Sequence, residues 1–213
     1  MLSRRAALGG GLAAAAALGG APGWAARPPT VGLPLTMRSR PSWGARPAAP
    51  GGRPHTITRL ILHHSAGAAV GAAGAAAALR GIQAFHQNEK GWIDVAYHLF
   101  VDQDGGLWEG RDRALAGDTA TTYDPAGGLL VCVLGDHERA PPAPAVGAAL
   151  RALGPKLAAA FGVPAEWVLH GDLAATACPG RHLRAWWAAE RAAAGPGPGG
   201  EGRALREPSV PAP

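Results

Sequence analysis

Short apolar runs bounded by polar or turn residues are the first regular pattern in the middle of the chain. Runs of this kind predict buried strands, and they occur at 59–64, 96–102, 107–109, 129–134 and 167–170. Asp104, Gly105 and Gly106 predict a tight hairpin turn between the second and third runs. The run at 59–64 ends in two adjacent histidines, so polar side chains are expected where this strand ends.

Longer segments carry apolar residues at helical spacing and predict helices at 75–86, 146–161 and 181–193. In the second of them, Leu150, Leu153 and Leu157 fall on one face, which would pack on a sheet. Strands and helices follow one another without a regular strand–helix–strand alternation. The pattern therefore predicts an α/β fold in which a mixed central β-sheet is covered by helices.

The two ends of the chain differ from its middle. Arg4-Arg5, a stretch of Ala, Leu and Gly, and then small residues predict an export signal at 1–26. Its Ser3-Arg4-Arg5 start resembles a twin-arginine signal; an ordinary secretory signal or an uncleaved anchor are the alternatives. The Gly- and Pro-rich segment 193–213 lacks an apolar period and predicts a disordered tail. A linker at 27–36 and one domain at 37–192 remain.

The basic charge of the chain depends partly on the export signal. Removing the two arginines of that signal lowers the formal charge from +5 to +3. Only 16% of the residues are charged, and no basic run or basic–aromatic interleaving occurs. We therefore expect no nucleic-acid partner. We expect a monomer that is exported to the periplasm, cell wall or exterior, without stable membrane insertion once the signal is removed.

Histidines and cysteines supply the candidate chemistry. His170 and Cys178 flank a loop and could converge on one metal ion. His63 or His64 could add a third ligand, but adjacent strand residues face opposite ways, so only one of them can do so. The alternatives are strand-end histidines bonded to backbone and, because an exported protein permits it, a Cys132–Cys178 disulfide. Against the disulfide, Cys132 lies in an apolar run.

Ordered motifs then carry a family resemblance. They are Trp43-Gly44-Ala45, Leu62-His63-His64-Ser65, Trp92-Ile93-Asp94-Val95-Ala96-Tyr97-His98-Leu99, Trp108-Glu109-Gly110-Arg111, His170-Gly171-Asp172 and Thr176-Ala177-Cys178-Pro179-Gly180. Together they resemble the type 2 N-acetylmuramoyl-L-alanine amidases, which include peptidoglycan recognition proteins and phage amidase lysozymes. The resemblance extends from Arg40 to Trp187 and implies the fold of peptidoglycan recognition proteins.

The resemblance also implies an activity and its residues. It implies a Zn²⁺ cofactor held by His63, His170 and Cys178, with a fourth position left for water. Zinc lowers the pKa of that water, so that hydroxide can attack the amide between N-acetylmuramic acid and L-alanine of peptidoglycan or muropeptides. Tyr97 falls on the catalytic tyrosine and would stabilise the oxyanion. Thr176 falls on a supporting position near the metal water.

Two related functions compete with hydrolysis of peptidoglycan. One is a binding module of the same fold that does not cleave; such relatives typically lose the cysteine that Cys178 matches. The other is an amidase for anhydro-muropeptides inside the cell, which typically carries Asp in place of this cysteine. With Cys178 and Tyr97 both present, we expect catalysis and, from Cys178 as a zinc thiolate, no disulfide.

The remaining candidates receive lesser roles. We expect His64 to be structural, His86 to be a packing residue and Asp94 to be a turn carboxylate or one that supports the site. His98 is a weak candidate, Glu109 and Arg111 are expected to form an ion pair, and Trp92 is either core or groove wall. Departures from the family occur at Gly117-Asp118-Thr119, where relatives carry a histidine, and at Asp124, where they carry asparagine. They leave the expected metal ligands untouched.

Overall fold

The computed structural model describes residues 35–194 of the 213-residue chain. Three predicted segments lie wholly or partly outside the described residues: the export signal at 1–26, the linker residues 27–34 and the tail residues 195–213. Among the described helices, none combines the length and the apolar character that crossing a membrane requires.

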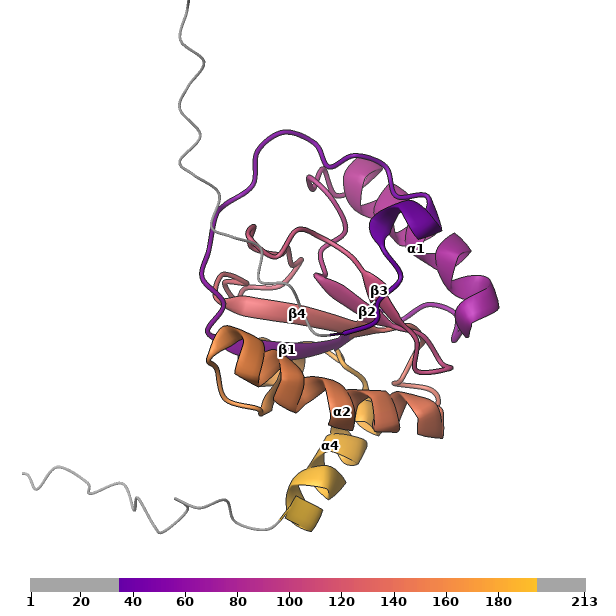
Figure 1. The fold of residues 1–213 in the computed structure, drawn as a ribbon, viewed down its shortest axis with the longest axis vertical. Coiled ribbons are helices and arrows are strands. Elements are labelled where there is room, and N and C mark those ends of the chain that lie inside the picture. Colours follow the sequence, from indigo (N-terminus) through magenta and orange to yellow (C-terminus); the bar gives the residue numbers. More distant parts are fainter. Residues whose placement is uncertain (1–34, 195–213) are drawn as a thin grey trace, which may run out of the picture.

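A five-stranded mixed sheet forms the centre of the fold (Figure 1). The strand order is β3-β2-β4-β1-β5; β3 is antiparallel to β2, and all other neighbours are parallel. The strands are β1 (Arg59–His64), β2 (Leu99–Val101), β3 (Leu107–Glu109), β4 (Gly128–Val133) and β5 (Trp167–Leu169). The predicted α/β class, with a mixed sheet covered by helices, is confirmed.

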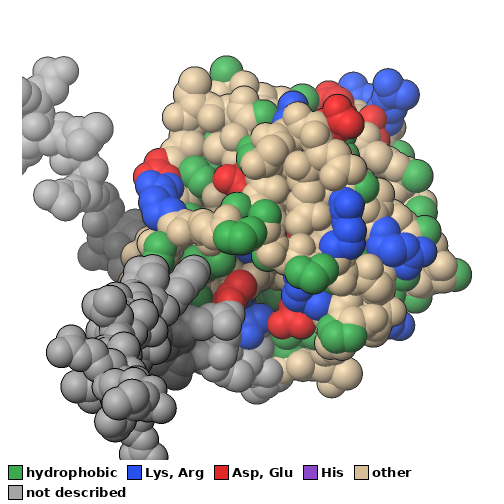
Figure 2. Space-filling view, turned by 90° about the horizontal axis from the view of Figure 1, so that it is seen from above, with side chains coloured by type: hydrophobic (Ala, Val, Ile, Leu, Met, Phe, Trp, Pro, Cys, Tyr) green, Lys and Arg blue, Asp and Glu red, His purple; other side chains and the backbone are tan. Residues whose placement is uncertain are grey.

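Helices cover both faces of this sheet (Figure 1). Helices α2 (Pro144–Phe161) and α4 (Arg181–Ala194) lie on one face, and α1 (Ala72–Asn88) lies on the other with the 3₁₀ turn η1 (Arg40–Trp43). A one-turn helix, α3 (His170–Leu173), directly follows β5. On the surface shown in Figure 2, basic, acidic and hydrophobic side chains are interspersed.

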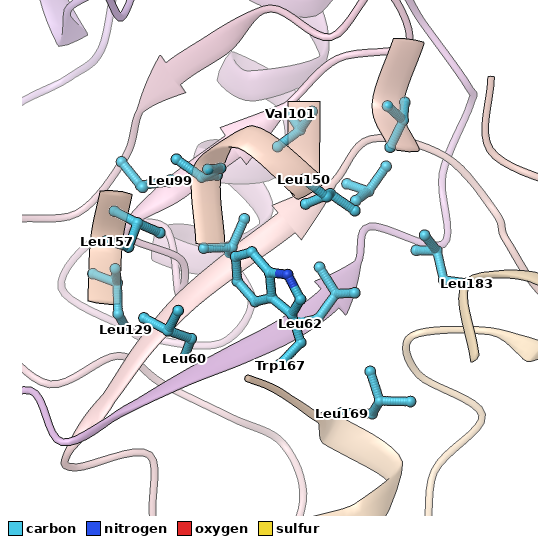
Figure 3. Packing of buried hydrophobic residues seen from close by; sticks show 14 of the residues in the cluster. Leu60, Leu62, Leu99, Val101, Leu129, Leu150, Leu157, Trp167, Leu169 and Leu183 are labelled. Carbon is cyan, nitrogen blue, oxygen red and sulfur yellow. The ribbon is translucent and has the colours of Figure 1, made fainter. Parts of the chain in front are cut away.

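The alternation of side chains along the strands divides the core into two clusters. Leu60 and Leu62 of β1 pack with Leu150 of α2 in the larger cluster (Figure 3). On the opposite face, Cys132 of β4 packs with Leu79 of α1. Burial of each leucine side chain contributes about 1.5–3 kcal/mol. Together the two clusters hold the sheet as a rigid support between the helices.

Several helix and strand ends differ from their predicted positions. Helix α1 begins at Ala72 rather than at 75, because the Asp104 carboxylate accepts the backbone N–H of Ala72 at 2.8 Å and caps the first turn from another segment. Helix α2 begins at Pro144 rather than at 146, since proline is well suited to the first helical position. The predicted strand at 96–102 shortens to β2, and the N–H of Ala96 bonds to Nδ1 of His86 at 3.0 Å.

Candidate metal centre and groove

Three side chains with metal-binding atoms converge at the carboxyl ends of β1 and β5. His63 lies on β1, His170 begins α3 directly after β5, and Cys178 lies in the loop before α4. Because β1 and β5 are parallel neighbours, their carboxyl ends meet, and the two imidazole rings lie 4.7 Å apart. One nitrogen of each histidine and Sγ of Cys178 all lie within 4.8 Å of one another. The structure thus brings together the three predicted ligands.

The two adjacent histidines of β1 point to opposite faces of the sheet. His63 is in register with Cys132, on the α1 side, and its Nδ1 lies 3.6 Å from Sγ of Cys178. Nδ1 of His64 instead accepts the backbone N–H of His137 at 3.0 Å. Of the pair, only His63 faces His170 and Cys178, as strand alternation requires.

Cys178 is held by its neighbours in a position where its sulfur faces the histidines. Its Sγ accepts the backbone N–H of His64 at 3.4 Å, and its own N–H donates to Oγ1 of Thr176 at 3.2 Å. Both cysteines are free, with Cys132 buried in β4. Burial raises the pKa of the Cys178 thiol to about 12. A thiolate here therefore requires a cation beside it.

The two histidines have the electrostatic character of metal ligands. Burial lowers the pKa of His63 well below its usual range, and the neighbouring His170 and His64 lower it further. Burial also lowers the pKa of His170, whose Nδ1 is buried without a hydrogen-bond partner among the described residues. Neutral imidazoles and a cysteine sulfur are the donors that zinc prefers. The residues therefore fit a zinc ion with three protein ligands.

A groove of about 730 Å³ opens over this cluster. His63, His170 and Cys178 line it, as do Tyr97 and Thr176. Farther along, its wall is formed by residues of α1, by Trp92 and by the loop that contains Asp118, Thr119 and Thr121. The groove therefore brings a bound molecule alongside the candidate metal ligands and the predicted catalytic tyrosine.

Tyr97 lies beside the candidate metal centre. Its ring is 5.2 Å from that of His63 and packs edge-on against Phe100, with ring centroids 5.5 Å apart. Burial raises the pKa of Tyr97 well above its usual range. Its hydroxyl group consequently stays protonated near neutral pH and can donate a hydrogen bond into the groove.

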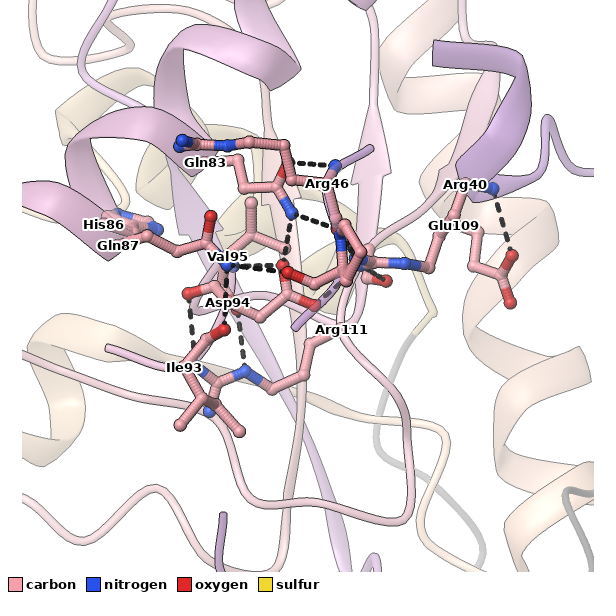
Figure 4. Close-up of polar contacts among 12 residues, drawn as sticks. Arg40, Arg46, Gln83, His86, Gln87, Ile93, Asp94, Val95, Glu109 and Arg111 are labelled. Carbon is pink, nitrogen blue, oxygen red and sulfur yellow. Dashed lines mark hydrogen bonds and ion pairs between the residues drawn. The ribbon is translucent and has the colours of Figure 1, made fainter. Parts of the chain in front are cut away.

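A buried polar network holds the segment that precedes Tyr97 (Figure 4). The Asp94 carboxylate lies 2.8 Å from the Arg40 guanidinium and accepts hydrogen bonds from Gln83 Nε2 and from the N–H of Val95, both at 2.8 Å. Nε of Arg111 donates to the carbonyl oxygen of Val95 at 2.7 Å. Asp94 thus supports the segment that leads to Tyr97, linking it to η1 and α1.

The expected Glu109–Arg111 ion pair is wrong. Arg111 is only 2% exposed and turns inward, where it pairs with Asp118 and donates to backbone carbonyl groups. Glu109 lies 3.9 Å from Arg113 instead. A buried guanidinium needs several acceptors, and the interior loops offer more of them than the hairpin does.

Two other histidines have structural roles. His98 is fully buried and uses both ring nitrogens on backbone: Nδ1 accepts the N–H of Leu130 and Nε2 contacts the carbonyl oxygen of Leu115, each at 2.9 Å. His86 packs against Trp92, with ring centroids 4.7 Å apart, and accepts the N–H of Ala96. Neither histidine joins the candidate metal ligands.

Sequence reasoning missed two residues that contact these ligands. Oγ1 of Thr121 lies 2.8 Å from Nε2 of His170, and the hydroxyl group of Tyr123 lies 3.4 Å from Nε2 of His63. Both come from an irregular loop in which no apolar period or metal-ligand spacing marks them. The nearest signal was the departure from the family at Asp118–Thr119 and at Asp124.

Comparisons with known proteins find relatives both by sequence and by structure. A family profile described as N-acetylmuramoyl-L-alanine amidase matches residues 53–181. The endolysin of Klebsiella phage KP32 is 35% identical over 114 residues, which cover 51% of this chain and 74% of the endolysin.

Solved structures show the same fold. The crystal structure of Drosophila peptidoglycan recognition protein SD matches with a TM-score of 0.66 at 22% identity, covering 71% of this chain and 92% of that one. Human PGRP-IBETAC in complex with glycosamyl muramyl pentapeptide matches with a TM-score of 0.61 at 25% identity, covering 68% and 90%.

Proposed function

The chain belongs to the N-acetylmuramoyl-L-alanine amidase family, and on that basis we propose that it is a zinc-dependent hydrolase of peptidoglycan. The bond cleaved is the amide between N-acetylmuramic acid and L-alanine of the stem peptide. One observation carries the proposal: His63, His170 and Cys178 place ligand atoms within 4.8 Å of one another in the wall of a groove.

The residues around the groove suit the chemistry of amide hydrolysis. When bound by His63, His170 and Cys178, zinc supplies Lewis-acid chemistry that activates water and polarises a carbonyl group. Tyr97 keeps its proton and donates a hydrogen bond to the negative charge that develops on the amide oxygen. Thr176 fixes the backbone of Cys178 and so orients the thiolate.

The groove also supports a ligand of this class. Its volume of about 730 Å³ is in the range of small-molecule sites, and the groove is open along the surface. We propose peptidoglycan or muropeptides as the partner, since a human relative of the same fold forms a complex with a muramyl pentapeptide.

A peptidoglycan-binding module without catalysis is the second candidate, because relatives of the same fold are recognition proteins. Binding alone needs the groove, but it does not need a thiol beside two neutral imidazoles. The presence of Cys178 within reach of both histidines favours hydrolysis.

Replacing the thiol ligand tests the proposal. We expect Cys178→Ala to lose bound zinc and to stop releasing stem peptides from cell-wall sacculi, because a catalytic zinc site has three protein ligands and the variant keeps only two histidines. Cys132→Ala is the matched control: its thiol lies in the core, so zinc content and release should remain. Release by Cys178→Ala at the wild-type rate would contradict the zinc mechanism.

A further inference from the structure

Two hydroxyl groups from one loop contact the two histidines of the candidate metal centre. Thr121 Oγ1 lies 2.8 Å from Nε2 of His170, and the Tyr123 hydroxyl lies 3.4 Å from Nε2 of His63. The Tyr123 ring also packs 4.9 Å from the His170 ring. Each histidine thus has a hydroxyl group beside the same ring nitrogen, Nε2.

The other ring nitrogen of each histidine has a different environment. Nδ1 of His63 lies 3.6 Å from Sγ of Cys178. Nδ1 of His170 is buried and has no hydrogen-bond partner in the part of the chain that the structure describes. A neutral imidazole has one N–H and one lone pair. If Nε2 carries the hydrogen and donates it to a hydroxyl group, Nδ1 presents the lone pair in both rings.

Thr119 provides an acceptor for the Thr121 hydroxyl. The Thr121 hydroxyl oxygen lies 2.8 Å from Oγ1 of Thr119, which also accepts the backbone N–H of Thr121 at 3.1 Å. A Thr121 hydroxyl that donates to Thr119 has its lone pairs free to accept from His170. With Thr119 as its acceptor, Thr121 can take the hydrogen of His170 Nε2, and the hydrogen bonds then run from His170 outward.

Ion pairs fasten this loop at both ends. Asp118 pairs with the buried Arg111, and Asp124 pairs with Arg53. The Asp124 carbonyl oxygen also accepts from Arg59 of β1 at 3.0 Å. The loop is thereby anchored to the sheet that carries His63, so its hydroxyl groups meet the imidazoles at set positions.

From this arrangement we propose that Thr121 and Tyr123 are positioning residues for the metal. They hold His170 and His63 in the tautomer with hydrogen on Nε2 and leave Nδ1 of both rings to ligate zinc. The inference rests on the proposed function, because it assumes that these histidines bind zinc. Thr119 and Thr121 also line the groove, so the same loop contacts both the metal ligands and the bound molecule.

Zinc affinity of the full chain, measured by competition with a chromophoric chelator, tests this role. Thr121→Val keeps the shape of the side chain and removes its hydroxyl group, and Tyr123→Phe does the same for tyrosine. Loss of such a hydrogen bond to a metal-bound histidine weakens metal binding by about 10–100-fold, and we expect a decrease in this range for each variant. Thr121→Ser retains the hydroxyl group and should bind zinc as the wild type does.

A neighbouring residue provides the matched control. Thr122 is exposed on the same loop, so Thr122→Val should leave zinc affinity unchanged. Substitution with Co²⁺ gives a second readout, since its absorption spectrum reports ligand geometry. We expect altered spectra for Thr121→Val and Tyr123→Phe but not for Thr121→Ser or Thr122→Val. Equal melting temperatures of the metal-free proteins would separate positioning of the ligands from a general loss of structure.

The outcomes distinguish this inference from the function on which it rests. Wild-type zinc affinity and Co²⁺ spectra in both hydroxyl-free variants would overturn the positioning role while the zinc hydrolase stands. A wild-type protein that binds no zinc would overturn both. If Thr121→Val fails to fold, Thr121→Ala and Tyr123→Phe decide the question by the same measurements.

Discussion

At the scale of single residues, the chemistry of the groove depends on which groups keep their protons. Burial raises the pKa of both Tyr97 and Cys178, and it lowers the pKa of His63. The tyrosine is therefore a hydrogen-bond donor, and the imidazole offers a lone pair. The thiol would become a metal ligand only if a cation replaced its proton, so binding of the proposed zinc would release a proton at this site.

Removing the tyrosine hydroxyl separates catalysis from metal binding. We expect Tyr97→Phe to lower turnover about 10²–10³-fold, the usual effect of losing one donor to a developing oxyanion. Zinc content should remain, because Tyr97 is not among the three candidate ligands. Activity assays on sacculi together with metal analysis check both points, and an unchanged turnover rate would exclude Tyr97 from the mechanism.

The contacts of residues on strands were predicted correctly more often than those of residues in loops, because alternation along a strand determines which way each side chain points. Alternation required that only one histidine of the β1 pair face the other ligands, and His63 does. The partners of Arg111 and the contact of Thr121 with His170 depend on where an irregular loop crosses the sheet. No local pattern encodes that crossing, so the first was predicted wrongly and the second was missed.

At the scale of elements, the ends of neighbouring parallel strands bring distant parts of the chain together. His98, just before β2, connects this region to β4 and to a loop through two hydrogen bonds to backbone. Burial lowers its pKa to about 3, and nearby arginines and His55 add to the shift. The folded protein therefore holds His98 as the neutral imidazole over most of the acid range.

This buried histidine makes stability depend on pH. Below the ordinary pKa of 6.5 the unfolded chain binds a proton at His98, whereas the folded protein binds it only near pH 3. The contribution of neutral His98 to the free energy of unfolding is thus fully present above pH 6.5. It is lost as the pH falls toward 3, by about 1.4 kcal/mol per pH unit. We would measure the free energy of unfolding of wild type and His98→Gln by urea unfolding at several pH values between 3 and 6.5. Plotted against pH, the two free energies should have slopes that differ by this amount. Equal slopes would contradict the low pKa of His98.

Element types were predicted more reliably than element boundaries. All five strands and the helices α1, α2 and α4 occur where hydrophobic periodicity placed them. Their ends moved where another segment supplied a hydrogen bond, as Asp104 does for α1. The short α3 was not predicted, because its four residues are too few for a helical period; the predicted strand 167–170 therefore ends one residue early, and His170 begins α3.

At the scale of the whole molecule, the sheet supports both the helices and the candidate site. Each face has its own core cluster, and the groove opens beside the carboxyl ends of β1 and β5. Peptidoglycan lies outside the cytoplasm, so export would bring a hydrolase into contact with this polymer. We propose that the signal at 1–26 directs the chain across the membrane by the twin-arginine route.

Conservative changes to the two arginines test the route. We expect that replacing Arg4 and Arg5 together by lysine blocks export in a bacterial host with this pathway, because the pathway reads the arginine pair rather than its charge. Arg27→Lys, after the predicted signal, is the control that should be exported normally. Cell fractionation gives the answer: unchanged export of the double variant would indicate an ordinary secretory signal.

The most direct test of the central claim is to measure zinc and reaction products together. The protein lacking its signal is analysed for metal, incubated with sacculi, and the released fragments are identified by mass spectrometry. We predict about one zinc per chain and stem peptides that begin with a free L-alanine amino group, separated from N-acetylmuramic acid. Fragments in which this amide is intact, or cleavage of it by zinc-free protein at an undiminished rate, would contradict the claim.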